Sequence, residues 1–272
     1  MSSHADETGR DAPSPAGGGV RSLTGAIGAF FASLRDLLAR GLVALGVTPN
    51  ALTGLGCLLS AAAGLAFALG PPWQRWPAAL LLTAAGACDM LDGAVAKLGR
   101  RETAFGAFLD SSLDRASDSL LFGGLFWYWA SRGAFALAGL SFSALLAAFL
   151  VSYTRARAEN LIDSCKVGFW ERGERTVLLL VGTTFAALPA TVLVLGTLVH
   201  LTALQRLLHT RRVLEGRGRP QSGREPPTGR LPRLGWWFVH RLLFWAYPRA
   251  SPPYDVVVAV TIAFVLLVPL PL

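Results

Sequence analysis

Apolar residues occur in long runs along most of the chain, and charged residues are concentrated in the short segments between these runs. A helix needs roughly 20 apolar residues to cross the hydrocarbon core of a bilayer. Runs that reach or approach this length cover residues 51–70, 77–97, 106–130, 134–157, 174–188 and 189–209. The pattern therefore predicts an all-α integral membrane protein, a helical bundle with six transmembrane helices.

The segment before the first run has two different patterns. Residues 1–20 are polar and rich in Gly, Pro, Ser and Ala, which predicts a disordered N-terminal tail. In residues 21–47, apolar positions recur at a spacing of three and four, and Arg35, Asp36 and Arg40 interrupt the apolar surface. This pattern is typical of an amphipathic helix that lies in the membrane interface.

The sequence predicts a membrane domain over residues 48–212 and a C-terminal extension over residues 213–272. The extension begins with a basic loop rich in Arg, Gly and Pro. Its aromatic and basic segment 236–247 is expected to be an interfacial helix. The apolar run 255–272 is of marginal length for a span, so it predicts an additional apolar helix without deciding whether that helix crosses the membrane.

Composition agrees with a membrane protein, because 53% of the 272 residues are hydrophobic and only 15% are charged. The formal net charge is +8, and basic residues gather at one set of helix ends. They are Lys97, Arg100, Arg101, Arg155, Arg157, Lys166, Arg172, Arg175, Arg206, Arg211 and Arg212. This side is predicted to face the cytoplasm of a multi-pass cell membrane protein. Arg157 and Arg172 are interpreted as membrane anchors, and nucleic acid is not expected as a partner.

Two pairs of carboxylates stand at this basic side. Asp89 and Asp92 lie three residues apart near the end of one span, and Asp110 and Asp114 lie four apart near the start of the next. Each spacing places both side chains on one helix face. Unpaired carboxylates at membrane depth cost on the order of 3 kcal/mol each, so a cation is expected to neutralise them. Oxygen ligands without His or Cys favour Mg²⁺, with Mn²⁺ as an alternative, and two such ions suit phosphoryl chemistry.

The spacing of these residues resembles a known family signature. Residues 89–114 follow the pattern D-x2-D-G-x2-A-R-x8-G-x3-D-x3-D of the CDP-alcohol phosphotransferases, with Lys97 in place of the Arg. The resemblance extends over roughly residues 22–212. Lysine keeps the positive charge but lacks the planar fork of arginine, which affects contact with the nucleotide or diphosphate rather than the reaction.

The resemblance implies an enzyme, a CDP-alcohol phosphatidyltransferase of phospholipid biosynthesis that acts as a homodimer. Two divalent ions would bind the diphosphate of CDP-diacylglycerol, an acceptor hydroxyl would attack, and CMP would leave. By the match, Asp89, Asp92, Asp110 and Asp114 are metal ligands, and Asp114 is also the catalytic base. The matching CDP-lipid positions are Asn50, Ala51, Leu52, Thr53, Gly93, Lys97, Thr103 and Gly106.

The acceptor is indicated by the segment 152–175, which is similar to the phosphatidylinositol phosphate synthase and archaetidylinositol phosphate synthase branch of the family. The resemblance assigns Arg155, Arg175 and Arg206 to the phosphate of the acceptor. Arginine suits a phosphomonoester because it makes paired, charge-assisted hydrogen bonds. A sugar phosphate is therefore expected, with L-myo-inositol 1-phosphate as first choice and glycerol 3-phosphate as the alternative.

Two alternatives lie outside this class of enzyme. A divalent-cation transporter also gathers carboxylates in a membrane, although near the midplane on broken helices rather than at helix ends. A catalytically silent lipid-binding membrane protein is the other, because Lys97 replaces the signature arginine. The intact Asp114 argues against it.

Overall fold

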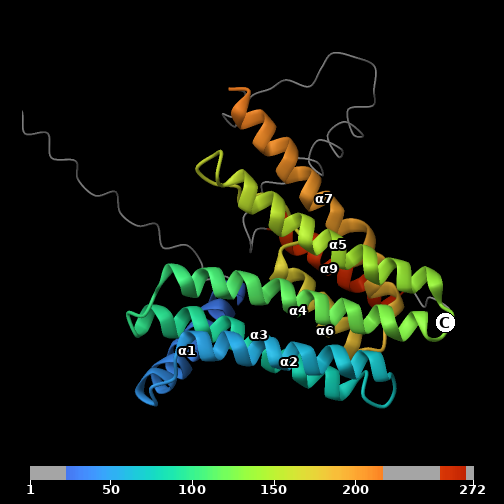
Figure 1. Ribbon diagram of the computed structural model, residues 1–272, viewed down its shortest axis with the longest axis horizontal. Coiled ribbons are helices and arrows are strands. Elements are labelled where there is room, and N and C mark those ends of the chain that lie inside the picture. Colours follow the sequence, from blue (N-terminus) through green and yellow to red (C-terminus); the bar gives the residue numbers. More distant parts are fainter. Residues whose placement is uncertain (1–22, 217–251, 268–272) are drawn as a thin grey trace, which may run out of the picture.

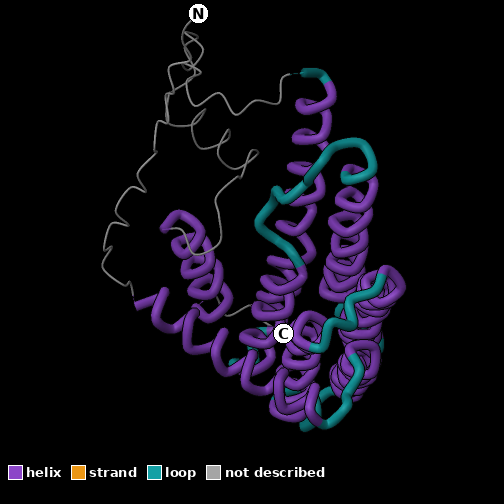
Figure 2. Tube along the Cα trace, turned by 90° about the vertical axis from the view of Figure 1, so that its left-hand side faces the viewer, coloured by secondary structure: helices purple, strands orange, loops and turns teal. Residues whose placement is uncertain are grey.

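The computed structural model describes residues 23–216 and 252–267, and the expected tail 1–20 and interfacial segment 236–247 lie outside these ranges. All regular structure within them is helical (Figures 1 and 2). The helices are α1 (Leu23–Ala44), α2 (Pro49–Leu69), α3 (Trp76–Leu98), α4 (Ala104–Ala130), α5 (Phe135–Ala158), α6 (Arg172–Thr184), α7 (Leu188–Leu214) and α9 (Pro252–Leu267). The longest connection between α1 and α7, residues 159–171, is the extended teal loop of Figure 2.

The helices α2 to α7 form a closed ring of neighbours. Following the contacts around the bundle, α2 packs against α3, α3 against α6, and α6 against α7. The ring continues from α7 to α5, then to α4, and returns from α4 to α2. Helix α1 packs on α3, and helix α9 packs on α6 and α7. Residues distant in sequence, on α3, α4 and the start of α6, are thereby placed to share one site.

Helix ends are set by local sequence signals. Thr48 caps α2, because its Oγ1 accepts a hydrogen bond from the Ala51 backbone N–H, and Pro49 occupies the first turn. Thr103 caps α4 in the same way, accepting from the Gly106 N–H at 2.9 Å. The break expected near Leu188-Pro189 is also present, since α6 ends at Thr184 and α7 begins at Leu188.

Small residues bring the helices of the ring close together. A Cβ added at Gly124 of α4 would overlap the Gly64 carbonyl of α2, and one added at Gly64 would overlap the Leu120 carbonyl. Across α5 and α7, Ser143 donates a hydrogen bond to the Gly196 carbonyl at 2.7 Å. Small residues and interhelical hydrogen bonds at such crossings are typical of helix packing in membranes.

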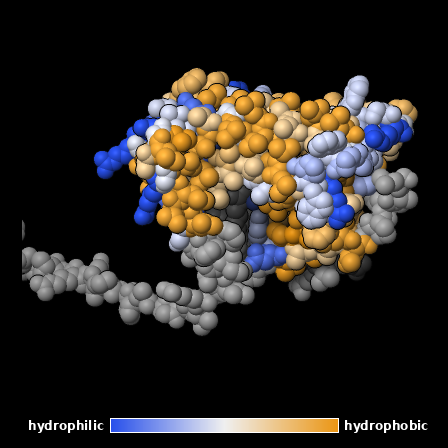
Figure 3. All heavy atoms as spheres, turned by 90° about the horizontal axis from the view of Figure 1, so that it is seen from below, coloured by the Kyte–Doolittle hydropathy of each residue, from blue (hydrophilic) through white to orange (hydrophobic). Residues whose placement is uncertain are grey.

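Large apolar side chains cover the outside of the bundle, as the face in Figure 3 shows. Leu58 is 69% exposed, Leu80 is 69% exposed and Phe135 is 75% exposed. Soluble proteins rarely expose large apolar patches, so this surface is suited to contact with lipid. Four helices among the described residues, α2, α3, α5 and α7, are long and apolar enough to cross a membrane.

The remaining two expected spans differ from the others. Helix α4 has 27 residues, but Asp110, Asp114 and Arg115 lie in its first half and Asp118 lies just past its midpoint. Helix α6 has 13 residues, which corresponds to roughly 20 Å, short of the roughly 30 Å hydrocarbon core. The multi-pass helical architecture is thus confirmed. Of the six expected spans, only four are long and apolar enough to cross a membrane by length and composition.

Candidate active site

The carboxylate cluster forms where the end of α3 meets the start of α4. Oxygens of Asp89, Asp110 and Asp114 all lie within 4.8 Å of one another. The short turn 99–103 between the helices reverses the chain and so places the two carboxylate pairs on facing surfaces. Oδ1 of Asp110 is buried and has no hydrogen-bond partner. Because a buried polar atom without a partner is costly, this oxygen is suited to act as a ligand atom for a cation.

Asp92 lines a small cavity beside this cluster, the acidic cavity, which has about 10 Å³ of space, and its carboxylate is oriented by protein groups. It is 7% exposed and lines this cavity together with Asp89 and Asp114. Its Oδ2 accepts a hydrogen bond from Thr53 Oγ1 at 2.8 Å, and its Oδ1 accepts one from the Gly93 N–H at 2.6 Å. Asp92 therefore lies beside the cluster, and the hydrogen bond from Thr53 ties its carboxylate to α2.

Arg172, the first residue of α6, is not a membrane anchor as the sequence suggested. One of its guanidinium nitrogens contacts the carboxylates of both Asp89 and Asp114. The expectation was wrong because it treated Arg172 as an isolated charge at a helix end. Arg172 and Arg175 are three residues apart and share a helix face, a spacing that could have indicated that both point into the bundle.

The donor set fits divalent cations. The cluster supplies carboxylate oxygens without a His or Cys ligand, which suits Mg²⁺ and Mn²⁺. The unpartnered Asp110 oxygen provides an open ligand position. Arg172 pairs with Asp89 and Asp114, and its one positive charge does not balance the three carboxylates of the cluster. Asp89, Asp110 and Asp114 are thus the residues that would hold an ion, with Asp92 beside them.

Most of the expected CDP-lipid residues lie at the start of α2, the end of α3 and the start of α4. The starts of α2 and α4 lie together, because a Cβ on Gly106 would be 3.3 Å from Asn50 Oδ1. Thr53 contacts Asp92, and Gly93 and Lys97 are exposed on the last turns of α3. Leu52 is different, since it is buried against Ala39 and Val95. Ala51 and Thr103 are exposed, and Thr103 also caps α4.

A second, basic cavity of about 180 Å³ adjoins the cluster. All three arginines expected to bind the acceptor line it: Arg155 from α5, Arg175 from α6 and Arg206 from α7. Asp114 lines both this cavity and the acidic one, and so does Arg172. The structure therefore places the sequence-derived base between the carboxylates and the arginines.

Ion pairs hold these arginines in place. Arg175, only 3% exposed, donates to Asp118 Oδ2 at 2.7 Å and to the Trp170 carbonyl. Arg206, 2% exposed, donates to Glu171 Oε1 at 3.0 Å. Sequence reasoning did not assign Asp118 and Glu171 to the site, although acidic residues are expected where guanidinium groups are buried.

Arg155 is the most accessible of the three expected arginines, with 39% of its side chain exposed. Its Nε donates to Glu159 Oε1 at 3.0 Å, and Glu171 Oε1 lies 3.8 Å from its Nη1. Burial raises the pKa of Glu159, but the hydrogen bond and charge of Arg155 outweigh this and hold the pKa below its ordinary value. Arg155 therefore faces an ionised partner at neutral pH.

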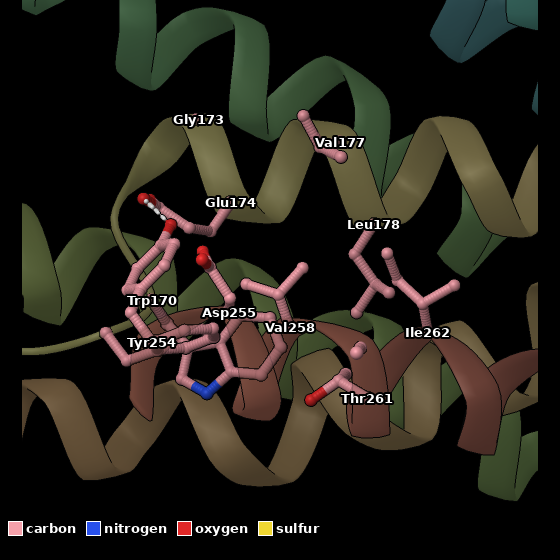
Figure 4. A pocket seen from close by; sticks show the side chains of 12 residues that line it. Trp170, Gly173, Glu174, Val177, Leu178, Tyr254, Asp255, Val258, Thr261 and Ile262 are labelled. Atoms are coloured by element: carbon pink, nitrogen blue, oxygen red, sulfur yellow. Dashed lines mark hydrogen bonds between the residues drawn. The ribbon is translucent and has the colours of Figure 1, made fainter. Parts of the chain in front are cut away.

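A third cavity, of about 450 Å³, lies between α6 and α9 (Figure 4). Val177, Leu178, Val258 and Ile262 give it apolar walls. At one end, the Tyr254 hydroxyl donates a hydrogen bond to Glu174 Oε1 at 2.8 Å. This contact joins the C-terminal extension to the first turn of α6, the turn that carries Arg172 and Arg175.

The sequence of the bundle matches one family model. Residues 46–208 match the model of the CDP-alcohol phosphatidyltransferases, and this match covers more than half of the chain. The acidic and basic cavities that share Asp114 agree with a phosphotransferase family. The chain belongs to the CDP-alcohol phosphatidyltransferase family, as the signature indicated.

Similar proteins point to one branch of this family. The archaetidylinositol phosphate synthase of Methanothermobacter thermautotrophicus is 39% identical over 164 residues, which cover 58% of this chain and 80% of the relative. A crystal structure of the phosphatidylinositol phosphate synthase of Mycobacterium tuberculosis with bound CDP-DAG matches with a TM-score of 0.59 and 32% identity. That match covers 65% of this chain and 94% of the solved one. A structure of the same enzyme with manganese and citrate matches with a TM-score of 0.57 and 34% identity, covering 65% and 88%.

Proposed function

We propose that this protein transfers the phosphatidyl group of CDP-diacylglycerol to L-myo-inositol 1-phosphate and releases CMP. The observation that carries this proposal is the position of Asp114, which lines both the acidic cavity and the arginine-lined cavity. A base at this boundary can reach an acceptor on one side while the CDP-lipid is held on the other. The names of the similar enzymes, synthases of inositol phosphate lipids, support the same substrates.

The carboxylate cluster, with the ions that it would hold, is proposed to bind the diphosphate of the CDP-lipid. Two Mg²⁺ ions, or Mn²⁺ in their place, would be held by Asp89, Asp92, Asp110 and Asp114. The carboxylate grouping and the manganese-bound structure of the similar enzyme support this assignment. When bound, these ions would neutralise charge on the diphosphate and on the departing CMP. The cytidine end would lie near Asn50, Thr53, Gly93 and Gly106.

In the proposed reaction, Asp114 accepts the proton of the acceptor hydroxyl. The hydroxyl oxygen forms a bond to the lipid-side phosphorus, and the bond from this phosphorus to the CMP oxygen breaks, so CMP leaves with the electron pair. A carboxylate is a weak base at neutral pH, so its contribution depends on its position beside the hydroxyl.

The basic cavity is proposed to hold the phosphate of the acceptor. Arg155, Arg175 and Arg206 line it, and a phosphomonoester dianion is the ligand that several guanidinium groups favour. The buried Arg175 and Arg206 have fixed positions because of Asp118 and Glu171. Free inositol has no phosphate for these arginines to bind, so a phosphorylated acceptor is preferred.

In the membrane, α2 to α7 are proposed to form six spans, with α4 and α6 completing the ring. The charged half of α4 would lie at the cytoplasmic rim, where its carboxylates meet the basic helix ends. The short α6 would begin in the site rather than at the membrane surface. By family resemblance, the protein is proposed to be a homodimer.

A panel of acceptors tests the proposed function. Purified protein in detergent with Mg²⁺ and CDP-diacylglycerol is incubated with inositol 1-phosphate, glycerol 3-phosphate or free inositol. CMP release is measured, and the lipid product is identified by mass spectrometry. Release with inositol 1-phosphate well above that with the other two is expected. If glycerol 3-phosphate gave the highest release, it would replace inositol 1-phosphate as the assigned acceptor. If no phosphorylated polyol gave release of CMP, the proposed function would be rejected.

A further inference from the structure

Arg172 connects the two cavities of the site. Its side chain contacts Asp89 on α3 and Asp114 on α4, although it belongs to α6. It lines both the acidic cavity and the basic cavity, and 26% of the side chain is exposed. Its positive charge therefore stands among the carboxylates that would hold a divalent ion.

The partners of Arg172 distinguish it from its neighbours in the basic cavity. Arg175 is paired with Asp118, and Arg206 with Glu171, so both have carboxylate partners outside the metal cluster. The ion pairs of Arg172 are made with members of that cluster. An ion that coordinates Asp89 and Asp114 would compete with Arg172 for these two carboxylates.

We propose that Arg172 is a positioning residue that moves from the carboxylate cluster to the acceptor's phosphate when a divalent ion binds. The guanidinium leaves Asp89 and Asp114 because two cations held at the same pair of carboxylates repel each other strongly. The basic cavity, whose wall Arg172 already forms, is next to it. There its planar fork adds donors for a phosphomonoester. This inference rests on the proposed function. It gives Arg172 a role in the binding of the metal ion and of the acceptor.

The exchange couples the two ligands. A phosphate that attracts Arg172 into the basic cavity also removes the competing cation from the carboxylates, so it strengthens binding of the ion. Because coupling between two binding sites is reciprocal, the ion strengthens binding of the phosphate by the same factor. Without an ion, Arg172 keeps the cluster partly neutralised.

Binding of Mn²⁺ tests the exchange without turnover. The free Mn²⁺ signal in electron paramagnetic resonance is measured for the full-length protein in nanodiscs without CDP-lipid. Arg172→Gln is expected to bind Mn²⁺ roughly tenfold more tightly than the wild type, because the competing cation is lost. Arg172→Lys, which keeps a charge but loses the fork, is expected to be intermediate. Arg157→Gln is the control, an exposed position of α5 outside both cavities, and should match the wild type.

A second arm adds inositol 1-phosphate to the same samples. The wild type and Arg157→Gln are expected to bind Mn²⁺ more tightly in its presence, whereas Arg172→Gln should show little of this gain. Weaker or unchanged Mn²⁺ binding by Arg172→Gln would overturn the exchange. An undiminished gain from inositol 1-phosphate in that variant would overturn it as well.

The variant Asp110→Asn separates failure of the inference from failure of the proposed function. Wild-type protein that binds no Mn²⁺, or whose binding is unaffected by Asp110→Asn, would overturn the metal site and the function with it. Binding that depends on Asp110 but does not respond to Arg172→Gln would overturn only the role of Arg172.

Discussion

Asp114 is the residue on which the proposed chemistry depends most, because it borders both cavities. We expect Asp114→Asn to lower kcat for CMP release by roughly 10²- to 10⁴-fold, the range of general acid-base contributions. The amide keeps the shape of the side chain but cannot accept the proton. Steady-state assays with CDP-diacylglycerol and inositol 1-phosphate measure this effect. Asp163→Asn, at an exposed position in the loop before α6, is the control and should retain activity. An Asp114→Asn enzyme with near-normal kcat would exclude it as the base.

Arg155 provides a test of the acceptor site that does not disturb the core. It is the most exposed of the three expected arginines, whereas removal of Arg175 would leave the buried Asp118 without its partner. We expect Arg155→Ala to raise KM for inositol 1-phosphate about tenfold or more, since hydrogen bonds to charged groups contribute about 1.5–3 kcal/mol. The KM for CDP-diacylglycerol should change little.

The matched control for this prediction is Arg157→Ala, because Arg157 lies on the same last turn of α5 but outside the basic cavity. It should leave both KM values unchanged. If Arg155→Ala raised the two KM values equally, the assignment of Arg155 to the acceptor phosphate would be wrong.

At the scale of residues, the sequence located most of the candidate site. The fixed spacing of the carboxylates indicated a cluster, and the oxygens of three of them lie close together. The interpretation of Arg172 failed because membrane anchoring and ion pairing both require a basic residue at a helix end. Only the three-dimensional path of α6 brings that end to α3 and α4.

Among the helices, the crossing of α2 and α4 is the contact most sensitive to side-chain size. We expect Gly124→Ala to lower the thermal stability of the purified protein, because the added methyl group would overlap the Gly64 carbonyl. Overpacking of this kind typically costs about 1–3 kcal/mol. Gly123→Ala is the control, since a Cβ there has no neighbour within 4 Å. Equal melting temperatures for the two variants would contradict the close crossing.

Helix boundaries were well indicated by the sequence, and helix roles less so. Thr48, Pro49 and Thr103 act locally, so the starts of α2 and α4 could be recognised from caps and proline. The short α6 could not be recognised, because its apolar residues run to position 181 and look like the beginning of a span. Likewise, the packing of α9 on α6 and α7 depends on contacts such as that of Tyr254 with Glu174, which no local pattern encodes.

For the whole molecule, the account requires the carboxylate end of the bundle to face the cytoplasm. Cysteine substitutions at two exposed positions test this orientation in cells. Glu102→Cys lies in the turn between α3 and α4, and Ser131→Cys lies in the turn between α4 and α5 at the other end of α4. We expect a membrane-impermeant maleimide to label Ser131→Cys in intact cells and Glu102→Cys only after permeabilisation. The parent protein, with its own cysteines, is the reference, and the reverse pattern would place the site outside the cell.

The order of the helices around the ring is a property of the whole molecule, and it could not be predicted from the sequence. Apolar runs define how many helices can lie in a bilayer, but they do not determine which ones touch. In the order α2, α3, α6, α7, α5, α4, Gly64 and Gly124 permit the close crossing of α2 and α4, and Gly196 permits that of α7 and α5. It is this order that brings α6 beside α3 and completes the site.

Anomalous X-ray diffraction from crystals grown with Mn²⁺ tests the central claim most directly. The account predicts an anomalous peak about 2 Å from carboxylate oxygens of Asp89, Asp110 and Asp114, the distance expected for a hard divalent ion. A fully loaded protein whose peaks all lie elsewhere, with these carboxylates still occupied by Arg172 alone, would contradict the metal-dependent site and the reaction built upon it.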